Sequence, residues 1–254
     1  MKPPLFSGFN IWGEWVDRSC GKKSGVLFCG FITILYLRGD LGKEMNKIKA
    51  ALFDLDGVVF DTEPQYTIFW GQVCREYHPE IPDLEHQIKG QTLVQIFDKY
   101  FSDVKEEQAS IVQRLNEFEL KMKFEYVNGF ESFIRDLRKN GVKTAVVTSS
   151  NREKMESVYQ QRPEFKALFD AILTSEDFDE SKPSPDCYLK GAARFGVRPE
   201  ECVVFEDSFN GLKSGRASGA FVVGLSTTNQ AEDIAPYADQ VISDFTDLQL
   251  GNKN

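Results

Sequence analysis

The chain has 254 residues, which is enough for one large domain, or for one domain with an insertion, and for an extensive buried core. With 41% hydrophobic and 27% charged residues, its composition is that of an ordinary soluble protein. The net charge of −9 disfavours nucleic acid and anionic membranes as partners. Five cysteines without a Cys-x-x-Cys pair indicate a reducing compartment. The two histidines, His78 and His86, disfavour a histidine triad or zinc cage, and we expect both at the solvated surface.

The first 46 residues differ from the rest of the chain because they show no clear periodicity. Their apolar run, 26–37, is too short for a comfortable membrane span, and no small-x-small cleavage site follows it. Met45 comes shortly before the first predicted strand, where a natural start would lie. We therefore expect 1–44 to be a translated upstream extension and 1–46 to lie outside the fold, with a membrane anchor as the alternative.

The most informative stretch is 50–62, where a short apolar run ends in two carboxylates. Such a run predicts a strand of a buried parallel sheet. Asp54 would lie at the strand tip and Asp56 on a loop that Gly57 allows to turn sharply. Open α/β sheets bind their ligands at the carboxyl ends of the strands. An isolated Asp-x-Asp-Gly is more often a plain acidic turn, so its meaning depends on the rest of the chain.

Residues 63–126 predict a small helical unit, because apolar residues recur there at helical spacing in three successive segments. Pro64 suits the first turn of the first helix. These apolar stripes are explained by packing between helices, and nothing in them demands a ligand. The three stripes are Ile68, Phe69, Val73 and Tyr77; Leu93, Ile96, Phe97 and Tyr100; and Ile111, Leu115, Phe118 and Met122.

From residue 130 onward, helix and strand patterns alternate. Ser150 with Glu153 predicts a capping box at the start of one helix, and Ser184-Pro185 predicts the N-cap and first position of another. Five strands are expected besides the one that ends at Asp54. They cover 142–147, 170–173, 202–205, 220–223 and 240–242.

This alternation predicts an α/β fold with a doubly wound, Rossmann-like parallel sheet and right-handed crossovers. The helical segment 63–126 interrupts the alternation directly after the first strand, so we expect it to be an inserted helical cap beside the Asp54 tip. The catalytic core would then be formed by 47–62 and 127–254.

Polar groups of complementary kinds follow the predicted strands. Thr148 and the amide of Ser149 lie at a helix N-terminus suited to a phosphate, Lys182 lies on the next loop, and Glu206 with Asp207 follows the fourth strand. Each has a plain explanation alone, as a helix cap, a solvated lysine or an acidic turn. Those explanations do not account for their joint occurrence at one edge of a parallel sheet.

This set of motifs resembles the haloacid dehalogenase superfamily, specifically its phosphotransferase branch, which has a helical cap inserted after the first motif. The resemblance extends from about residue 47 to residue 245, and four motifs in order are far more specific than any one of them. The motifs are Phe53-Asp54-Leu55-Asp56-Gly57-Val58, Thr148-Ser149, Lys182-Pro183, and Glu206-Asp207-Ser208 with Asn210-Gly211.

The resemblance implies a phosphatase mechanism. Asp54 attacks phosphorus and forms an aspartyl-phosphate, and Asp56 protonates the leaving alcohol and then deprotonates the attacking water. Thr148, the Ser149 amide and Lys182 hold the transferring oxygens. The cap closes over the site and excludes bulk water.

The implied cofactor is Mg²⁺, which lets an anionic nucleophile approach an anionic phosphate and keeps several of its waters. The implied metal ligands are Asp54, the backbone carbonyl of Asp56, Asp207 and, beside or on the metal, Glu206.

Within this branch the sequence is similar to sugar-phosphate phosphatases and to β-phosphoglucomutase, both of which share the Asp61-Thr62-Glu63 continuation. The mutases carry a histidine where Tyr66 stands, and in their cap an arginine grips the distal phosphate where Leu93 stands. Both differences disfavour a mutase. Lys89, which begins the same cap pattern, is equally compatible with substrate contact and with a solvated helix end.

We therefore predict a cytoplasmic Mg²⁺-dependent phosphatase for a small phosphorylated metabolite, with a sugar phosphate as the expected class. The alternatives are a β-phosphoglucomutase-type phosphotransferase and a non-catalytic binding protein on the same fold, and pyrophosphatase activity also stays open. No nucleic-acid or membrane partner is expected. The sequence does not specify the oligomeric state, for which a monomer is the default expectation.

Overall fold

The computed structural model describes residues 47–89, 91–246 and 248, and the predictions about residues 1–46 lie outside that range. Within the described residues, six parallel strands form one sheet in the order β3-β2-β1-β4-β5-β6. The strands are β1 (Ala50–Phe53), β2 (Lys143–Val147), β3 (Ala171–Leu173), β4 (Cys202–Glu206), β5 (Phe221–Leu225) and β6 (Gln240–Ile242).

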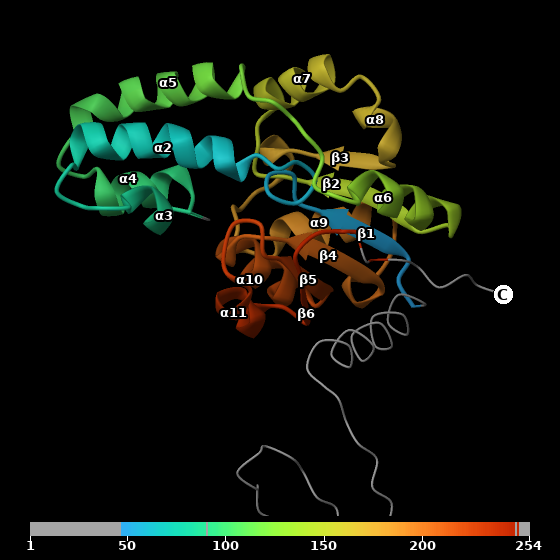
Figure 1. Ribbon diagram of the computed structural model, residues 1–254. Helices are drawn as coiled ribbons and strands as arrows, with labels where there is room; N and C mark the ends of the chain where they lie inside the picture. The colour runs from blue at the N-terminus through green and yellow to red at the C-terminus, as the bar shows by residue number, and fades with distance from the viewer. Residues whose placement is uncertain (1–46, 90, 247, 249–254) are drawn as a thin grey trace, which may run out of the picture. The chain divides into compact units, whose positions relative to one another are not determined.

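The helices divide into a group encoded directly after β1, at residues 63–119, and a group from residue 130 onward that alternates with the strands, and Figure 1 draws the first group together, apart from the sheet. The first group is α2 (Glu63–Tyr77), α3 (Leu84–Gln87), α4 (Leu93–Tyr100) and α5 (Gln108–Glu119). The second is α6 (Phe130–Lys139), α7 (Arg152–Gln161), α8 (Phe165–Leu168), α9 (Asp186–Arg194), α10 (Phe209–Ser218) and α11 (Ala231–Ile234).

The central strand β1 is fully buried and points alternate side chains into two apolar layers. On one face Phe53 stacks on Phe205 of β4, with ring centroids 4.7 Å apart, in the same cluster as residues of α6 and α7. On the other face Leu52 lies against α9, where Gly191 permits a close approach: a Cβ at that position would lie 3.2 Å from Leu52. Burial on both faces explains why β1 reads as a continuous apolar run.

The order of the strands places the ends of β1, β2 and β4 at one edge of the sheet. β2 and β3 lie on one side of β1, whereas β4, β5 and β6 lie on the other, so the winding reverses at β1. Phe53 pairs in register with Val146 of β2 and Phe205 of β4. The residues that follow these three strands therefore lie together, at the reversal point where such folds bind ligands. The predicted doubly wound α/β sheet is confirmed.

The helices of the first group, α2 to α5, have an apolar cluster of their own, in which Trp70, Phe101 and Ile111 are buried. Such a cluster supports their packing as a separate layer. We propose the predicted organisation of a cap at 63–126 inserted in a core formed by 47–62 and 127–254. Among the described residues, no helix is both long and apolar enough to cross a bilayer.

Two predicted helix starts and one predicted surface residue differ in the structure. The N-cap of α7 is Asn151 rather than Ser150, and its side chain accepts a hydrogen bond from the amide of Lys154 at 2.9 Å. The helix predicted to start at Pro185 begins one residue later. His78 is 6% exposed and packs edge-on against Phe101, because the end of α2 is covered by the cap cluster, whereas His86 is exposed as predicted.

Candidate active site

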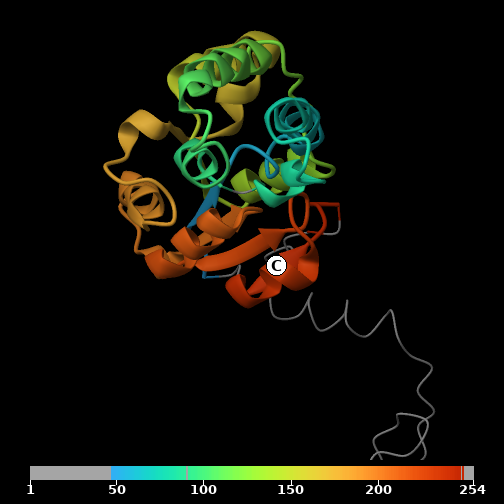
Figure 2. The same ribbon diagram turned by 90° about the vertical axis from the view of Figure 1, so that its left-hand side faces the viewer.

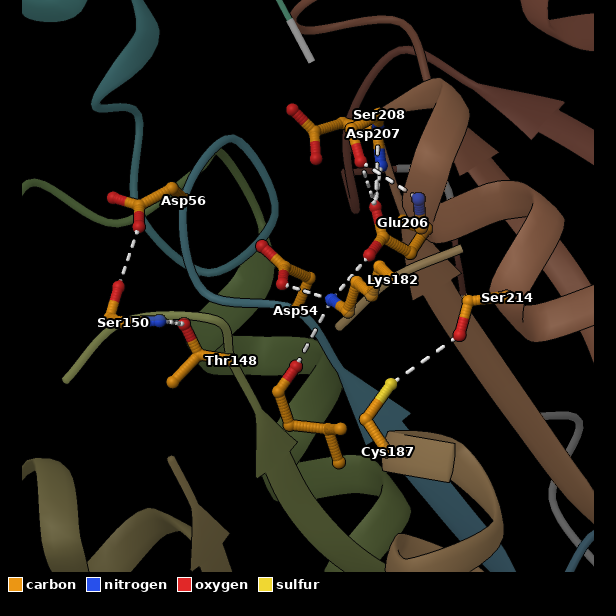
Figure 3. Close-up of polar contacts among 12 residues, drawn as sticks. Asp54, Asp56, Thr148, Ser150, Lys182, Cys187, Glu206, Asp207, Ser208 and Ser214 are labelled. Atoms are coloured by element: carbon orange, nitrogen blue, oxygen red, sulfur yellow. Dashed lines mark hydrogen bonds and ion pairs between the residues drawn. The ribbon is translucent and has the colours of Figure 1, made fainter. Parts of the chain in front are cut away.

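Lys182 joins the first and fourth motifs at the carboxyl edge of the sheet (Figure 3). Its Nζ donates to Asp54 Oδ1 and to Glu206 Oε1, both at 2.6 Å, and to the backbone carbonyl of Val147 at 3.3 Å. Asp54 directly follows β1, and its amide donates to the carbonyl of Phe205 at the end of β4. Lys182 is only 7% exposed, so these charge-assisted bonds form where water competes little.

Glu206, the last residue of β4, is a fully buried acceptor of several hydrogen bonds. Its Oε1 accepts from Lys182 and from the hydroxyl of Tyr188, the latter at 2.8 Å. Its Oε2 accepts from the amide of Asp207 at 3.0 Å and from the amide and hydroxyl of Ser208, both at 3.2 Å. Protein donors thus satisfy both carboxylate oxygens of Glu206. The same hydrogen bonds hold Lys182 and the start of α10 in place.

The charge balance of this cluster is negative. Burial raises the pKa of Asp54 to about 7, although attraction to Lys182 opposes the rise. Burial and repulsion from Glu206 raise the pKa of Asp207 well above its usual value. Burial by itself would lower the pKa of Lys182, but the carboxylates of Asp54 and Glu206 outweigh it and raise that pKa. Lys182 thus contacts two of the three carboxylates, and a further cation would relieve the repulsion that remains at Asp207.

The structure fits a metal ion held by few protein ligands. Among the described residues, no group of three or more His, Cys, Asp and Glu side chains is arranged to hold a metal by itself. Asp207, 3% exposed, and Asp54 both line the pocket described below. Mg²⁺ commonly binds to one or two carboxylates while keeping several waters. Two carboxylates in a cluster short of positive charge suit that ion.

Asp56 turns away from Lys182 and toward the loop after β2 (Figure 3). Its Oδ1 accepts from the hydroxyl of Thr62 at 2.8 Å. Its Oδ2 accepts from the hydroxyl of Ser150 at 3.2 Å and from Nζ of Lys154 at 2.6 Å. The two acids of the first motif therefore have separate partners: Asp54 belongs to the lysine cluster, and Asp56 to a second set of donors.

The second motif lines the same pocket as these two acids. Thr148 is buried, and its hydroxyl accepts a hydrogen bond from the amide of Ser150 at 3.0 Å. Ser149 is exposed, and both residues line the same pocket as Asp54. A hydroxyl and backbone amides at the start of α7 are suited to the oxygens of a phosphate.

The pocket has a volume of about 540 Å³ and is lined by residues of both helix groups. Its core side includes Asp54, Asp56, Thr148, Ser149, Lys182 and Asp207, and its other side includes Lys89 from the chain after α3. Lys89 lies 3.9 Å from Glu63, with 19% of its side chain exposed, so it is neither buried nor freely solvated. Every predicted site residue except the buried Glu206 lines this pocket.

Several residues of the site carry no motif in the sequence. Lys154 and Ser150 bind Asp56, Tyr188 binds Glu206, and the hydroxyl of Thr228 donates to the carboxylate of Asp207. Lys154 and Tyr188 lie on helices α7 and α9, outside the four motifs, where the sequence does not show which carboxylate they contact. Ser150 suits a helix N-cap in the sequence, but in the structure its hydroxyl donates to Asp56.

The comparisons with known proteins agree with this geometry. The model of the family described as haloacid dehalogenase-like hydrolase matches residues 48–219. The Drosophila melanogaster protein named "Probable pseudouridine-5'-phosphatase" is 29% identical over 82% of this chain and 94% of its own length. The "Phosphorylated carbohydrates phosphatase" of Thermotoga maritima is 28% identical over 68% of this chain and 82% of its own.

A solved structure shows the same fold. The haloacid dehalogenase hydrolase of family IA, variant 3, from Entamoeba histolytica superposes with a TM-score of 0.69 at 21% identity, over 80% of this chain and 96% of its own. Haloacid dehalogenase-like hydrolases generally depend on Mg²⁺. The matched family, the strand order and the four motifs at one sheet edge all agree. This chain therefore belongs to the haloacid dehalogenase-like hydrolases and is a phosphoric monoester hydrolase that acts on small phosphorylated metabolites.

Proposed function

We propose that this chain is a Mg²⁺-dependent phosphatase that hydrolyses a sugar phosphate through an aspartyl-phosphate on Asp54. The observation that carries the proposal is the position of Asp54: its carboxylate lies at the tip of β1, lines the pocket and is held by the buried Lys182. A nucleophile fixed in this way needs little reorganisation before it reacts.

The reaction has two halves. In the first, an Asp54 oxygen forms a bond to phosphorus, the bond from phosphorus to the ester oxygen breaks, and Asp56 gives its proton to the leaving alcohol. In the second, water attacks the phosphorus of the aspartyl-phosphate, Asp56 takes a proton from that water, and the bond from phosphorus to Asp54 breaks. Inorganic phosphate leaves, and both aspartates return to their starting state.

The core residues around Asp54 supply the charge stabilisation. The ammonium of Lys182, the hydroxyl of Thr148 and the amide of Ser149 line the space beside Asp54 and are proposed to hold the phosphoryl oxygens. The carboxylates of Asp54 and Asp207 and the backbone carbonyl of Asp56 are proposed to hold Mg²⁺. When bound, the ion offsets the repulsion between the nucleophile and the phosphate.

Glu206 is left out of this proposed ligand set. Its two oxygens accept five hydrogen bonds from Lys182, Tyr188, Asp207 and Ser208, and the side chain is fully buried. A carboxylate so occupied anchors other groups of the site. We therefore propose that Glu206 stands beside the metal and positions Lys182 and Asp207.

The cap side of the pocket favours a leaving group with no second anion. Among the described residues that line the pocket, the cations are Lys89, Lys154 and Lys182, and each lies within 4.0 Å of a carboxylate. Leu93 lines the pocket at the position where a mutase would carry arginine. A bisphosphate would find no unpaired cation for its distal phosphate, so these contacts support a phosphatase over a mutase.

The test is release of inorganic phosphate from a panel of sugar phosphates, pyrophosphate and p-nitrophenyl phosphate, with Mg²⁺ and after its removal by chelation. We expect hydrolysis of at least one sugar phosphate that requires Mg²⁺ and is lost in Asp54→Asn. Interconversion of glucose 1- and 6-phosphates with a bisphosphate primer would support the mutase instead. Hydrolysis of pyrophosphate alone would support a pyrophosphatase, and absence of a beryllofluoride adduct at Asp54 would support a binding protein.

A further inference from the structure

Lys154 is a buried lysine that lies outside the four motifs. It lies in the first turn of α7 and is 4% exposed. Its Nζ donates to Asp56 Oδ2 at 2.6 Å and to the hydroxyl of Tyr66 at 2.6 Å, and it lies 4.0 Å from Glu119 Oε1. Burying an ammonium costs free energy of hydration unless hydrogen bonds and opposite charges offset the loss. A position used only for packing would therefore favour an apolar side chain.

The donors around Asp56 define the orientation of its carboxylate. They come from three segments: Thr62 at the N-cap of α2, Ser150 on the loop after β2, and Lys154 on α7. Lys154 makes the shortest of the three contacts and carries the only positive charge among them. Without Lys154, the two hydroxyls could follow a rotated carboxylate, because hydroxyls reorient freely.

Lys154 also connects Asp56 to the helices between β1 and β2. Tyr66 lies on α2 and donates from its hydroxyl to Glu119 Oε1 of α5 at 2.7 Å. Burial, with repulsion from Asp56 and Glu119, raises the pKa of Tyr66 well above its ordinary value, so its hydroxyl stays a donor. In Figure 2 the green α5 lies beside the yellow α7, as it does in Figure 1. The chain of contacts therefore runs from Asp56 through Lys154 and Tyr66 to Glu119.

We propose that Lys154 is a positioning residue for Asp56, which it holds in the orientation that serves the leaving oxygen while Tyr66 and Glu119 of the cap hold Lys154. The inference rests on the proposed function, because it assigns Asp56 the proton transfer. It predicts that Lys154 matters most for substrates whose leaving group must be protonated as it departs. A merely structural lysine would affect all substrates alike.

The experiment compares Lys154→Met with the wild type on two esters, ribose 5-phosphate and p-nitrophenyl phosphate. The first has an alkoxide leaving group that needs a proton, whereas nitrophenolate leaves without one. We measure kcat/KM, because it reports the steps up to transfer of the phosphoryl group to Asp54 and is independent of the later hydrolysis. We expect a loss of about 100-fold on ribose 5-phosphate and of less than about threefold on p-nitrophenyl phosphate.

Three further variants make the comparison specific. Lys154→Arg keeps the charge and should recover part of the loss on ribose 5-phosphate, and Tyr66→Phe should show a weaker form of the same substrate-dependent loss. Lys166→Met removes an exposed lysine of the neighbouring α8 and should leave both kcat/KM values unchanged. Equal losses on the two esters in Lys154→Met, or no loss on either, would overturn the inference.

A crystal structure of Lys154→Met tests the inference without any activity. We expect the Asp56 carboxylate to leave the orientation seen with Thr62 and Ser150, and an unchanged carboxylate would contradict the positioning role. Failure of the proposed function has a different signature, since the wild type would then hydrolyse no sugar phosphate of the panel. The structural result would still decide whether Lys154 positions Asp56.

Discussion

The two sides of the pocket are built differently. On the core side, Lys182 and Glu206 are nearly or fully buried, and both contacts of the lysine with carboxylates measure 2.6 Å. On the cap side, the side chains of Lys89 and Glu63 are 19% and 15% exposed, and Nζ of Lys89 lies 3.9 Å from Oε2 of Glu63. The core side is thus fixed before the substrate arrives, whereas the cap side keeps room to adjust.

This difference assigns separate tasks to the two sides. Chemistry common to all substrates belongs on strand tips, where register fixes the positions of the groups within the sheet. Selection among leaving groups belongs on the cap, where partly exposed side chains can change without disturbing the sheet. Substitutions around Asp54 should therefore affect every substrate, whereas those of cap side chains should affect some substrates more than others.

Removal of Lys182 should have the largest effect. Lys182→Met leaves the carboxylates of Asp54 and Glu206 together without their shared cation, so we expect a loss of about 3 kcal/mol in the free energy of unfolding. Both esters should lose about 100-fold or more in kcat, because a charge that stabilises the transition state is gone. Urea denaturation and steady-state kinetics measure the two effects.

The matched control is Lys190→Met on α9, whose partners Asp179 and Asp186 lie nearer the surface. It should change the free energy of unfolding by about 0.5 kcal/mol or less, because exposed ion pairs contribute little. Similar losses in the free energy of unfolding in Lys182→Met and Lys190→Met would contradict the proposed difference between the buried core side and the surface.

Gly57→Ala should weaken the metal site. Gly57 has a φ of 72°, and an added Cβ would clash with the carboxylate of Asp207 and lie 2.9 Å from Thr228 Oγ1. We expect a rise of about tenfold or more in the Mg²⁺ concentration needed for half-maximal activity, because Asp207 is displaced. Gly141→Ala, also at positive φ but with open space around it, is the control for backbone strain alone. Equal Mg²⁺ requirements in the two variants would contradict the role of Asp207.

Lys89→Met tests whether the cap side of the pocket contacts the leaving group. If Lys89 contacts the leaving group, KM for ribose 5-phosphate should rise by about tenfold, the effect of one lost charged hydrogen bond, while kcat stays near its wild-type value. KM for p-nitrophenyl phosphate should change less, because that leaving group lacks the sugar hydroxyls. An unchanged KM for every ester of the panel would assign Lys89 to a solvated helix end.

Glu63→Gln should have the smallest effect, on stability rather than on activity. Burial raises the pKa of Glu63 from 4.5 to about 7, with repulsion from Asp56 opposing the attraction to Lys89. Between these values the folded state keeps a proton that the unfolded chain has lost, so stability falls as the pH rises through this window. The wild type should lose on the order of 1 kcal/mol more than Glu63→Gln between about pH 5 and pH 8 without Mg²⁺. If the wild type and Glu63→Gln lost the same free energy of unfolding over this pH range, the raised pKa of Glu63 would be contradicted.

The sequence was sufficient for the sheet and for the residues at its edge. Parallel strands bring their carboxyl ends together, so the contact between Asp54 and Lys182, 128 positions apart, follows once the strands are recognised. The structure gives the positions of these side chains, and the roles assigned to them stay predictions. These residues are Asp54, Asp56, Lys89, Thr148, Ser149, Lys182, Glu206 and Asp207.

The partners of Asp56 could not be predicted, because they depend on how helices pack on the sheet. Lys154 lies between Glu153 and Met155 in the first turn of α7, and only the fold shows that its side chain is buried. Ser150 and Asn151 both suit a helix N-cap, and their neighbours decide between them: Asn151 caps α7, whereas Ser150 binds Asp56. The burial of His78 likewise depends on the packing of the cap helices.

The central claim is that Asp54 becomes phosphorylated during turnover. The most direct measurement is rapid acid quench of the enzyme during hydrolysis of a phosphate ester, followed by peptide mapping by mass spectrometry. The account predicts one phosphoryl group on the peptide that contains Asp54, at a level that rises and falls with turnover and is absent in Asp54→Asn. A phosphoryl group on another residue, or rapid turnover with none on the protein, would contradict it.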